Sequence, residues 1–150
     1  MDMFPAYSAF QIARPTIMVV DDDASIATLL YEFLSGEGYR VLVARNGRDA
    51  LARIKREPPA LVLCDWMMPA MDGPHLIAAV RHWQHRGAAI PVVLMSSAHD
   101  ANEALPGIPF VAKPFALDTV LDLVTSLTRP TLPPEVLDQP ASPPPERHDA

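Results

Sequence analysis

The sequence predicts an α/β fold, a doubly wound parallel sheet of five strands with helices on both faces. Five short apolar runs recur along the chain, and segments with apolar residues at helical spacing alternate with them. Strands that alternate with helices in this way form parallel sheets, because parallel neighbours need a crossover connection. Glycine and proline at the segment boundaries indicate where the elements end.

The predicted strands are short and rich in branched apolar residues, which is typical of strands buried on both faces. They cover Thr16–Val20, Tyr39–Ala44, Leu61–Cys64, Val92–Met95 and Ile108–Ala112. Each run is shorter than the ten or so residues that a buried helix usually needs. We therefore assign all five runs to the sheet.

Four segments carry apolar residues three and four positions apart, which predicts amphipathic helices. These residues are Ile26, Leu29, Leu30, Phe33 and Leu34; Ala50, Leu51 and Ile54; Leu76, Ile77 and Val80; and Leu117, Val120, Leu121 and Val124. Asp23 is expected to cap the first helix, and Gly36 ends it. Asn46 can cap the second, which stops at Pro58, and Pro74 suits the first turn of the third.

The segment between the fourth and fifth strands has room for a shortened helix only. Sixteen residues separate Ser96 from Lys113. A turn over Asp100–Leu105 fits this space, and Pro106 prevents its extension. We expect a fourth helix of about one to two turns, which by itself is marginal in water.

Length and composition predict one domain with a segment on either side of it. The chain has 150 residues, and its hydrophobic content of 49% can supply a core. We assign residues 1–15 to an N-terminal extension, 16–129 to the domain and 130–150 to a disordered tail. Seven of the last 21 residues are proline, and such a segment cannot bury enough apolar surface to order itself.

Charge and cysteine content limit the class of protein. A net charge of −6 at pH 7 argues against a nucleic-acid-binding surface. The single cysteine, Cys64, cannot form an internal disulfide, which fits a reducing compartment. Because no apolar run is long enough to span a bilayer, we predict a cytoplasmic protein that binds neither nucleic acid nor membrane.

Charged and hydroxyl side chains follow four of the predicted strands. They are Asp21, Asp22 and Asp23 after the first strand, Asp65 after the third, Ser96 after the fourth and Lys113 after the fifth. The carboxyl ends of parallel strands meet at one edge of the sheet, so these side chains should converge there. Crowded carboxylates repel one another unless a cation is present, and Mg2+ prefers such oxygen ligands. The combination suits phosphoryl transfer.

Four motifs resemble those of bacterial response-regulator receiver (CheY-like) domains, in order and in strand position. They are VVDDDAS, LVLCDWMMPAMDG, VVLMSS and FVAKPF, and the resemblance covers about residues 16–128. It implies the flavodoxin-like strand order 2-1-3-4-5. It also implies a stand-alone receiver of a two-component system, a phosphoacceptor signalling domain and not an enzyme.

The resemblance assigns the phosphoacceptor and the metal ligands. Asp65 would be the phosphoacceptor, whose carboxylate attacks the phosphorus of a phosphohistidine. With Asp65, Asp22 would bind Mg2+ directly, Asp21 would act through water, and Met67 would offer its backbone carbonyl.

The resemblance also implies a switch on the fourth and fifth strands. Ser96 would hold a phosphoryl oxygen, and Lys113 would pair with the acyl phosphate. The peptide bond between Lys113 and Pro114 is expected to be cis. Phe110 stands where the family has an aromatic residue that reorients as Ser96 moves on activation.

The partners implied are a histidine kinase or histidine phosphotransfer protein, and a downstream effector protein. In typical relatives the fourth helix, fifth strand and fifth helix form the phosphorylation-dependent dimer or partner face. Since the fourth helix is expected to be short here, we predict a monomer, or a dimer through another surface.

Two other functions fit parts of the sequence. Asp21, Asp23 and Ser25 match the D-x-D-x-[ST] start of haloacid-dehalogenase-like phosphatases, in which the first aspartate is the nucleophile. That reading leaves Asp65 without a role, and Lys113 is followed only by the isolated acids Asp118 and Asp122. The other alternative is a receiver-shaped interaction module that phosphorylation does not regulate.

Overall fold

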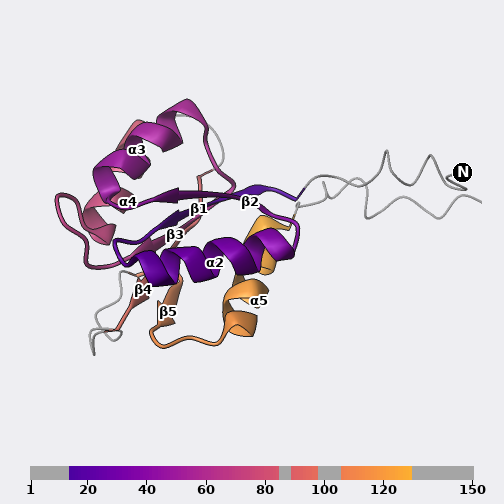
Figure 1. Cartoon of the computed structure of the whole chain (residues 1–150). Helices are drawn as coiled ribbons and strands as arrows, with labels where there is room; N and C mark the ends of the chain where they lie inside the picture. The colour runs from indigo at the N-terminus through magenta and orange to yellow at the C-terminus, as the bar shows by residue number, and fades with distance from the viewer. Residues whose placement is uncertain (1–13, 85–88, 98–105, 130–150) are drawn as a thin grey trace, which may run out of the picture.

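The computed structural model describes residues 14–84, 89–97 and 106–129, which contain a five-stranded parallel sheet (Figure 1). The strands are β1 (Thr16–Val20), β2 (Arg40–Ala44), β3 (Leu61–Asp65), β4 (Val92–Ser96) and β5 (Phe110–Ala112). Their order is β2-β1-β3-β4-β5, and every neighbouring pair is parallel. The predicted α/β class and strand order are confirmed.

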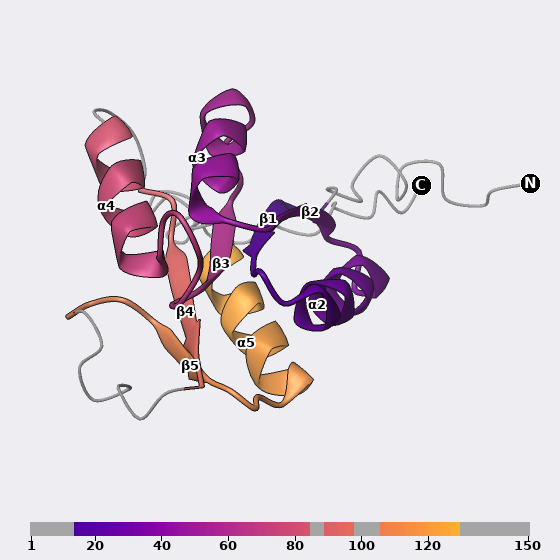
Figure 2. The ribbon, with the colours of Figure 1, turned by 60° about the vertical axis from the view of Figure 1, so that its left-hand side comes forward.

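In the part of the chain that the structure describes, four helices cover the two faces of this sheet (Figures 1 and 2). They are α2 (Ala24–Gly36), α3 (Gly47–Arg56), α4 (Gly73–Trp83) and α5 (Leu117–Thr128). The core beneath α2 and α5 takes Ile17 and Val19 from β1, whereas the core beneath α3 and α4 takes Met18 and Val20. Successive side chains of a strand point to opposite faces, so the central strands must be apolar throughout.

The helix starts follow the local signals of the sequence. The Asp23 carboxylate caps α2 by accepting the Ser25 N–H at 2.9 Å. The Asn46 side chain caps α3 through the Asp49 N–H at 2.8 Å. Pro74 lies in the first turn of α4, as expected. None of the described helices is both long and apolar enough to cross a membrane.

Four strand boundaries differ from the prediction, and two of these differences are single-residue extensions of β3 to Asp65 and of β4 to Ser96. β5 begins at Phe110 instead of Ile108, because Gly107 has a φ of +79° and Pro109 has no N–H to donate to the ladder. β2 begins one residue after Tyr39. The predicted turn over Asp100–Leu105, residues 1–13 of the extension and the tail lie outside the described residues.

At the end of the sheet where the strands begin, the Tyr39 side chain contacts both Arg14, which precedes β1, and helix α5. Its hydroxyl lies 3.3 Å from Thr125 Oγ1 on α5 and accepts a hydrogen bond of 3.3 Å from Arg14 Nη1. The Arg14 guanidinium also lies over the ring, 5.1 Å from its centroid. This cluster closes the core beneath α2 and α5 at the end opposite the polar side chains described next.

Candidate functional site

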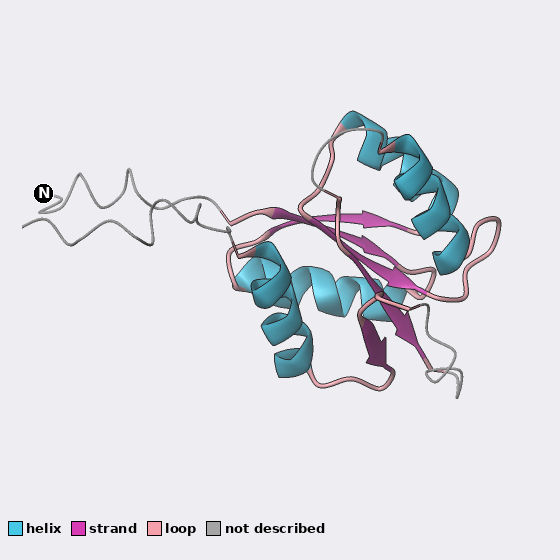
Figure 3. Cartoon of the chain, turned by 180° about the vertical axis from the view of Figure 1, so that it is seen from behind, coloured by secondary structure: helices cyan, strands magenta, loops and turns pink. Residues whose placement is uncertain are grey.

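The carboxyl ends of the strands point to one end of the sheet (Figure 3). A cavity of about 650 Å³ lies at this end. Its lining consists of Asp22, Asp23, Ile26, Asp65, Met67, Ser96, Ser97, Lys113 and Pro114. These residues come from four different strand ends, as predicted. The cavity is therefore the candidate functional site.

Asp21 and Lys113 form the base of the site. Asp21 is fully buried, and its Oδ2 accepts a hydrogen bond of 2.9 Å from Lys113 Nζ. The other carboxylate oxygen, Oδ1, accepts the Asp23 N–H at 2.9 Å. Burial alone would lower the pKa of Lys113, but its hydrogen bond to Asp21 and the charges of Asp21 and Asp65 outweigh burial and raise it. Lys113 is thus held as a cation.

Asp65 ends β3 with its carboxylate directed toward the same ammonium. Its Oδ1 lies 3.4 Å from Lys113 Nζ, and its side chain is 14% exposed. Burial raises the pKa of Asp65, and the charge of Asp21 raises it further, against the opposing effect of Lys113. One ammonium therefore faces two carboxylates, which leaves the site short of positive charge.

Three carboxylates at the site fit a hard divalent cation. Oxygen atoms of Asp21, Asp22 and Asp65 lie within 4.8 Å of one another. Mg2+ takes carboxylate oxygens and keeps water or phosphate oxygens in its remaining positions. Asp22 is exposed and can supply a ligand directly, whereas both Asp21 oxygens already accept hydrogen bonds. The donor set fits Mg2+, with Asp21 in a supporting position; a role for the Met67 carbonyl stays a prediction.

Ser96 reaches the site, and Phe110 does not. Ser96 is buried at the end of β4 and lines the cavity, and its carbonyl accepts the Lys113 N–H at 2.8 Å. The Lys113–Pro114 peptide is cis, as expected. Phe110 packs against the core beneath α3 and α4 and is not among the cavity-lining residues. A direct contact of Phe110 with the site is therefore absent, and its switch role stays a prediction.

Gly73, which we did not single out from the sequence, supports the site from behind. A Cβ at this position would lie 2.7 Å from Leu94 Cδ2 and 2.9 Å from the Asp65 carbonyl oxygen. The Gly73 N–H donates to the Trp66 carbonyl at 2.9 Å. The glycine of the turn motif MDG is the signal that could have shown this close approach.

Replacing Gly73 with alanine should therefore destabilise the protein by about 1–3 kcal/mol, as overpacking of a filled core does. Gly36→Ala is the matched control, because a Cβ there meets nothing within 4 Å. Urea unfolding of both variants measures the difference. If Gly73→Ala lowers the free energy of unfolding no more than Gly36→Ala does, the space around position 73 can accommodate a Cβ and the argument is wrong.

Comparisons with known proteins identify one family for this chain. The model of the response regulator receiver domain family matches residues 17–125. Response regulator MprA of Mycobacterium sp. (strain KMS) is 34% identical over 130 residues, which are 83% of this chain and 55% of that protein. Transcriptional regulatory protein ZraR of Salmonella typhimurium is 41% identical over 107 residues, or 68% of this chain and 24% of that protein. The chain thus spans about half of MprA and a quarter of ZraR.

Solved structures share the fold over three quarters of the chain. The receiver domain of the Francisella response regulator 1452 has a TM-score of 0.70 and 28% identity, covering 77% of this chain and 97% of that one. The chemotaxis protein CheY4 of Vibrio cholerae has a TM-score of 0.67 and 25% identity, covering 77% and 99%. Family match, fold and convergent acidic residues agree, and the chain belongs to the response regulator receiver domains, signalling domains of two-component systems.

Proposed function

We propose that Asp65 accepts a phosphoryl group from the phosphohistidine of a histidine kinase or histidine phosphotransfer protein, in a reaction that requires Mg2+. The observation that carries this proposal is the position of the Asp65 carboxylate. It lines the cavity, 3.4 Å from Lys113 Nζ and within 4.8 Å of the Asp21 and Asp22 oxygens. Phosphorylation and Mg binding are general features of the family.

In this reaction an Asp65 carboxylate oxygen forms the new O–P bond while the P–N bond to the donor imidazole breaks. The imidazole leaves with the electron pair of that bond and takes a proton from its surroundings. Lys113, held by Asp21, neutralises part of the negative charge that the phosphoryl group brings. Ser96 stands at the cavity wall, where its hydroxyl would hold a phosphoryl oxygen.

A bound Mg2+ would supply the remaining positive charge at the phosphoryl oxygens. Asp22 and Asp65 would hold it directly, Asp21 would act through water, and the Met67 carbonyl would complete the protein ligands. The phosphorylated state would then be read by an effector protein. Ser96 and Phe110 lie on adjacent strands, since Leu94 pairs with Phe110 and Ser96 with Ala112, so a shift of Ser96 would pass to β5.

Localisation of the phosphoryl group tests this proposal. The protein is incubated with acetyl phosphate and Mg2+, and the modified residue is found by mass spectrometry of peptides. We expect a single label on Asp65 that disappears when EDTA removes the metal. Label on Asp21 would restore the phosphatase alternative, and absence of label would favour an interaction module that is not regulated by phosphorylation.

The geometry around Asp21 argues against the phosphatase alternative. Asp21 has no exposed surface, and each of its carboxylate oxygens already accepts a hydrogen bond. A nucleophile needs a free oxygen in line with the phosphorus. Asp65 meets this requirement better, because it borders the cavity and Asp21 does not.

A further inference from the structure

Exposed cationic side chains lie along α3 and just before its start. Arg45, Arg48, Lys55 and Arg56 are all exposed, and we call them the basic stripe. Six of the 12 Lys and Arg residues of this acidic chain lie between positions 40 and 56, where Asp49 is the only acid. Positions 48, 52, 55 and 56 share one side of a helix because they are spaced by three and four residues.

Nearby polar groups are already paired, whereas the basic stripe is not. Arg40 forms a salt bridge with Glu57, and Arg53 Nη1 donates to the Val43 carbonyl at 2.6 Å. Asp49 accepts the Asn46 side-chain amide at 3.0 Å. Within residues 14–84, 89–97 and 106–129, no salt bridge includes a cation of the stripe. Its charge is therefore available to a partner.

We propose that the basic stripe docks an acidic segment of a partner protein. From Arg48 to Arg56 the stripe extends about 12 Å along the helix, a length suited to a short run of glutamates or aspartates. Ala52 lies exposed between the cations and leaves room for the aliphatic part of an incoming side chain. Opposite charges across such a surface speed association and select the partner.

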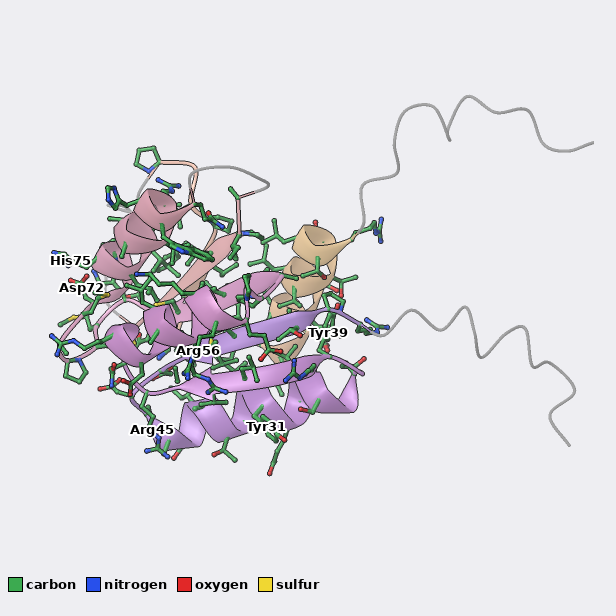
Figure 4. All side chains as sticks on the ribbon, turned by 90° about the horizontal axis from the view of Figure 1, so that it is seen from above. Tyr31, Tyr39, Arg45, Arg56, Asp72 and His75 are labelled. Carbon is green, nitrogen blue, oxygen red and sulfur yellow. The ribbon has the colours of Figure 1, made fainter. Side chains whose placement is uncertain are left out.

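The surroundings of the stripe favour a short acidic segment over a nucleic acid. Arg45 directly follows Ala44, whose carbonyl accepts the Asp21 N–H at 3.1 Å. A long polyanion that continued past Arg45 would therefore approach the carboxylates of the site and be repelled. In Figure 4 Arg56 lies between the start of α4, marked by Asp72 and His75, and α2, marked by Tyr31, and Arg45 lies beside one end of α2.

The stripe is also connected to the proposed phosphoacceptor, and this step rests on the proposed function. Gly47 begins α3, and a Cβ there would lie 2.5 Å from the Met71 carbonyl oxygen. Met71 belongs to the loop of residues 66–72 between Asp65 and α4. Because the Met71 backbone packs this closely on Gly47, a loop that phosphorylation shifts toward α3 would displace the start of that helix. We infer that phosphorylation changes the affinity of the stripe.

Binding of an oligoglutamate peptide of about eight residues, long enough to cover the stripe when extended, tests the docking surface. The probe carries a fluorophore, and its anisotropy is followed with the full chain. Arg48→Glu/Arg56→Glu should weaken binding about 10-fold or more. One glutamate then lies in the first turn of α3 and one in the last, so their effects on the helix dipole oppose each other.

Arg81→Glu/Arg129→Glu is the matched control, because both arginines are exposed and the net charge changes equally. It should change the affinity by less than about threefold. Thermal unfolding shows whether each variant is folded. Arg48→Gln/Arg56→Gln removes the two positive charges without reversing them, and it should lose part of the affinity. Equal losses in the two charge-reversal variants, or tighter binding of a duplex DNA than of the peptide, would overturn the proposal.

Repeating the titration with acetyl phosphate and Mg2+ tests the connection to Asp65. The affinity of the wild type should change by about fivefold or more, and that of Asp65→Asn should not change. A labelled wild type with unchanged affinity would overturn the connection. If Asp65 takes no label, the proposed function fails. The peptide titration of the unmodified protein still shows whether the basic stripe binds an acidic segment.

Discussion

Replacing Asp65 with asparagine should abolish phosphoryl labelling and, at the same time, make the metal-free protein more stable at neutral pH. The first effect follows because the amide is a poor nucleophile, both Asp21 oxygens already accept hydrogen bonds, and Asp22 would be held as a Mg2+ ligand. The second follows from electrostatics. Burial and the charge of Asp21 raise the pKa of Asp65, so its ionised form opposes folding.

The pH dependence of this stabilisation has a definite sign. The raised pKa means that the folded protein binds the Asp65 proton more tightly than the unfolded chain, whose aspartates titrate near about 3.9. Stability therefore falls as the pH rises from that value through the folded pKa, and the cost is fully present above it. The advantage of Asp65→Asn should disappear at acid pH.

Asp23→Asn is the control for this variant, because asparagine keeps the helix cap and removes the same charge close by. It should keep its label, and its stability should change little. Urea unfolding at several pH values gives the comparison, and Mg2+ should stabilise the wild type more than Asp65→Asn. Lower stability of Asp65→Asn at neutral pH would contradict the electrostatic argument.

Replacing Lys113 with methionine should lower the free energy of unfolding by about 3 kcal/mol at neutral pH. Asp21 is fully buried and the Lys113 side chain is 12% exposed, and loss of one partner from such a pair leaves an uncompensated charge. The pKa of Lys113 is raised in the fold. Its contribution is thus present below the ordinary lysine pKa of about 10.4 and is lost only as the pH rises through the folded value.

Lys55 is the other lysine of the chain and gives a matched control. It is exposed on α3 and has no salt bridge among the described residues. Lys55→Met should change the stability by less than about 0.5 kcal/mol. Mg2+ should restore part of the loss in Lys113→Met, since it supplies a cation to the same carboxylates. Similar small losses in both variants would mean that Asp21 does not depend on Lys113.

Much of the fold could be predicted because the sequence changes from apolar to polar residues where the central strands end. β1 and β3 are apolar until Asp21 and Asp65, and Asp23 and Asn46 are oxygen-bearing residues at the points where helices begin. The convergence of the acids then followed from parallel strand direction alone. The domain limits 16–129 stay a prediction, and the family match at 17–125 lies within them.

Other features depend on contacts between distant segments, which a local pattern does not contain. The complete burial of Asp21 arises because Lys113, 92 residues away, covers it. Gly73 is restricted by Leu94, a residue of a different strand. Phe110 packs against the core beneath α3 and α4, whereas Lys113 follows the end of β5 and lines the cavity. Phe110 is therefore not among the cavity-lining residues, and the role in activation that the resemblance implies for it stays a prediction.

Trp66 gives the site an optical reporter that needs no chemical label. It directly follows Asp65, and its N–H donates to the Met95 carbonyl at 2.8 Å while its carbonyl accepts the Gly73 N–H. These two bonds fix the Trp66 backbone next to Asp65, and its half-buried side chain packs against the core beneath α3 and α4. Trp83, the other tryptophan, lies at the far end of α4. Changes of charge at Asp65 can therefore be followed in real time by tryptophan fluorescence.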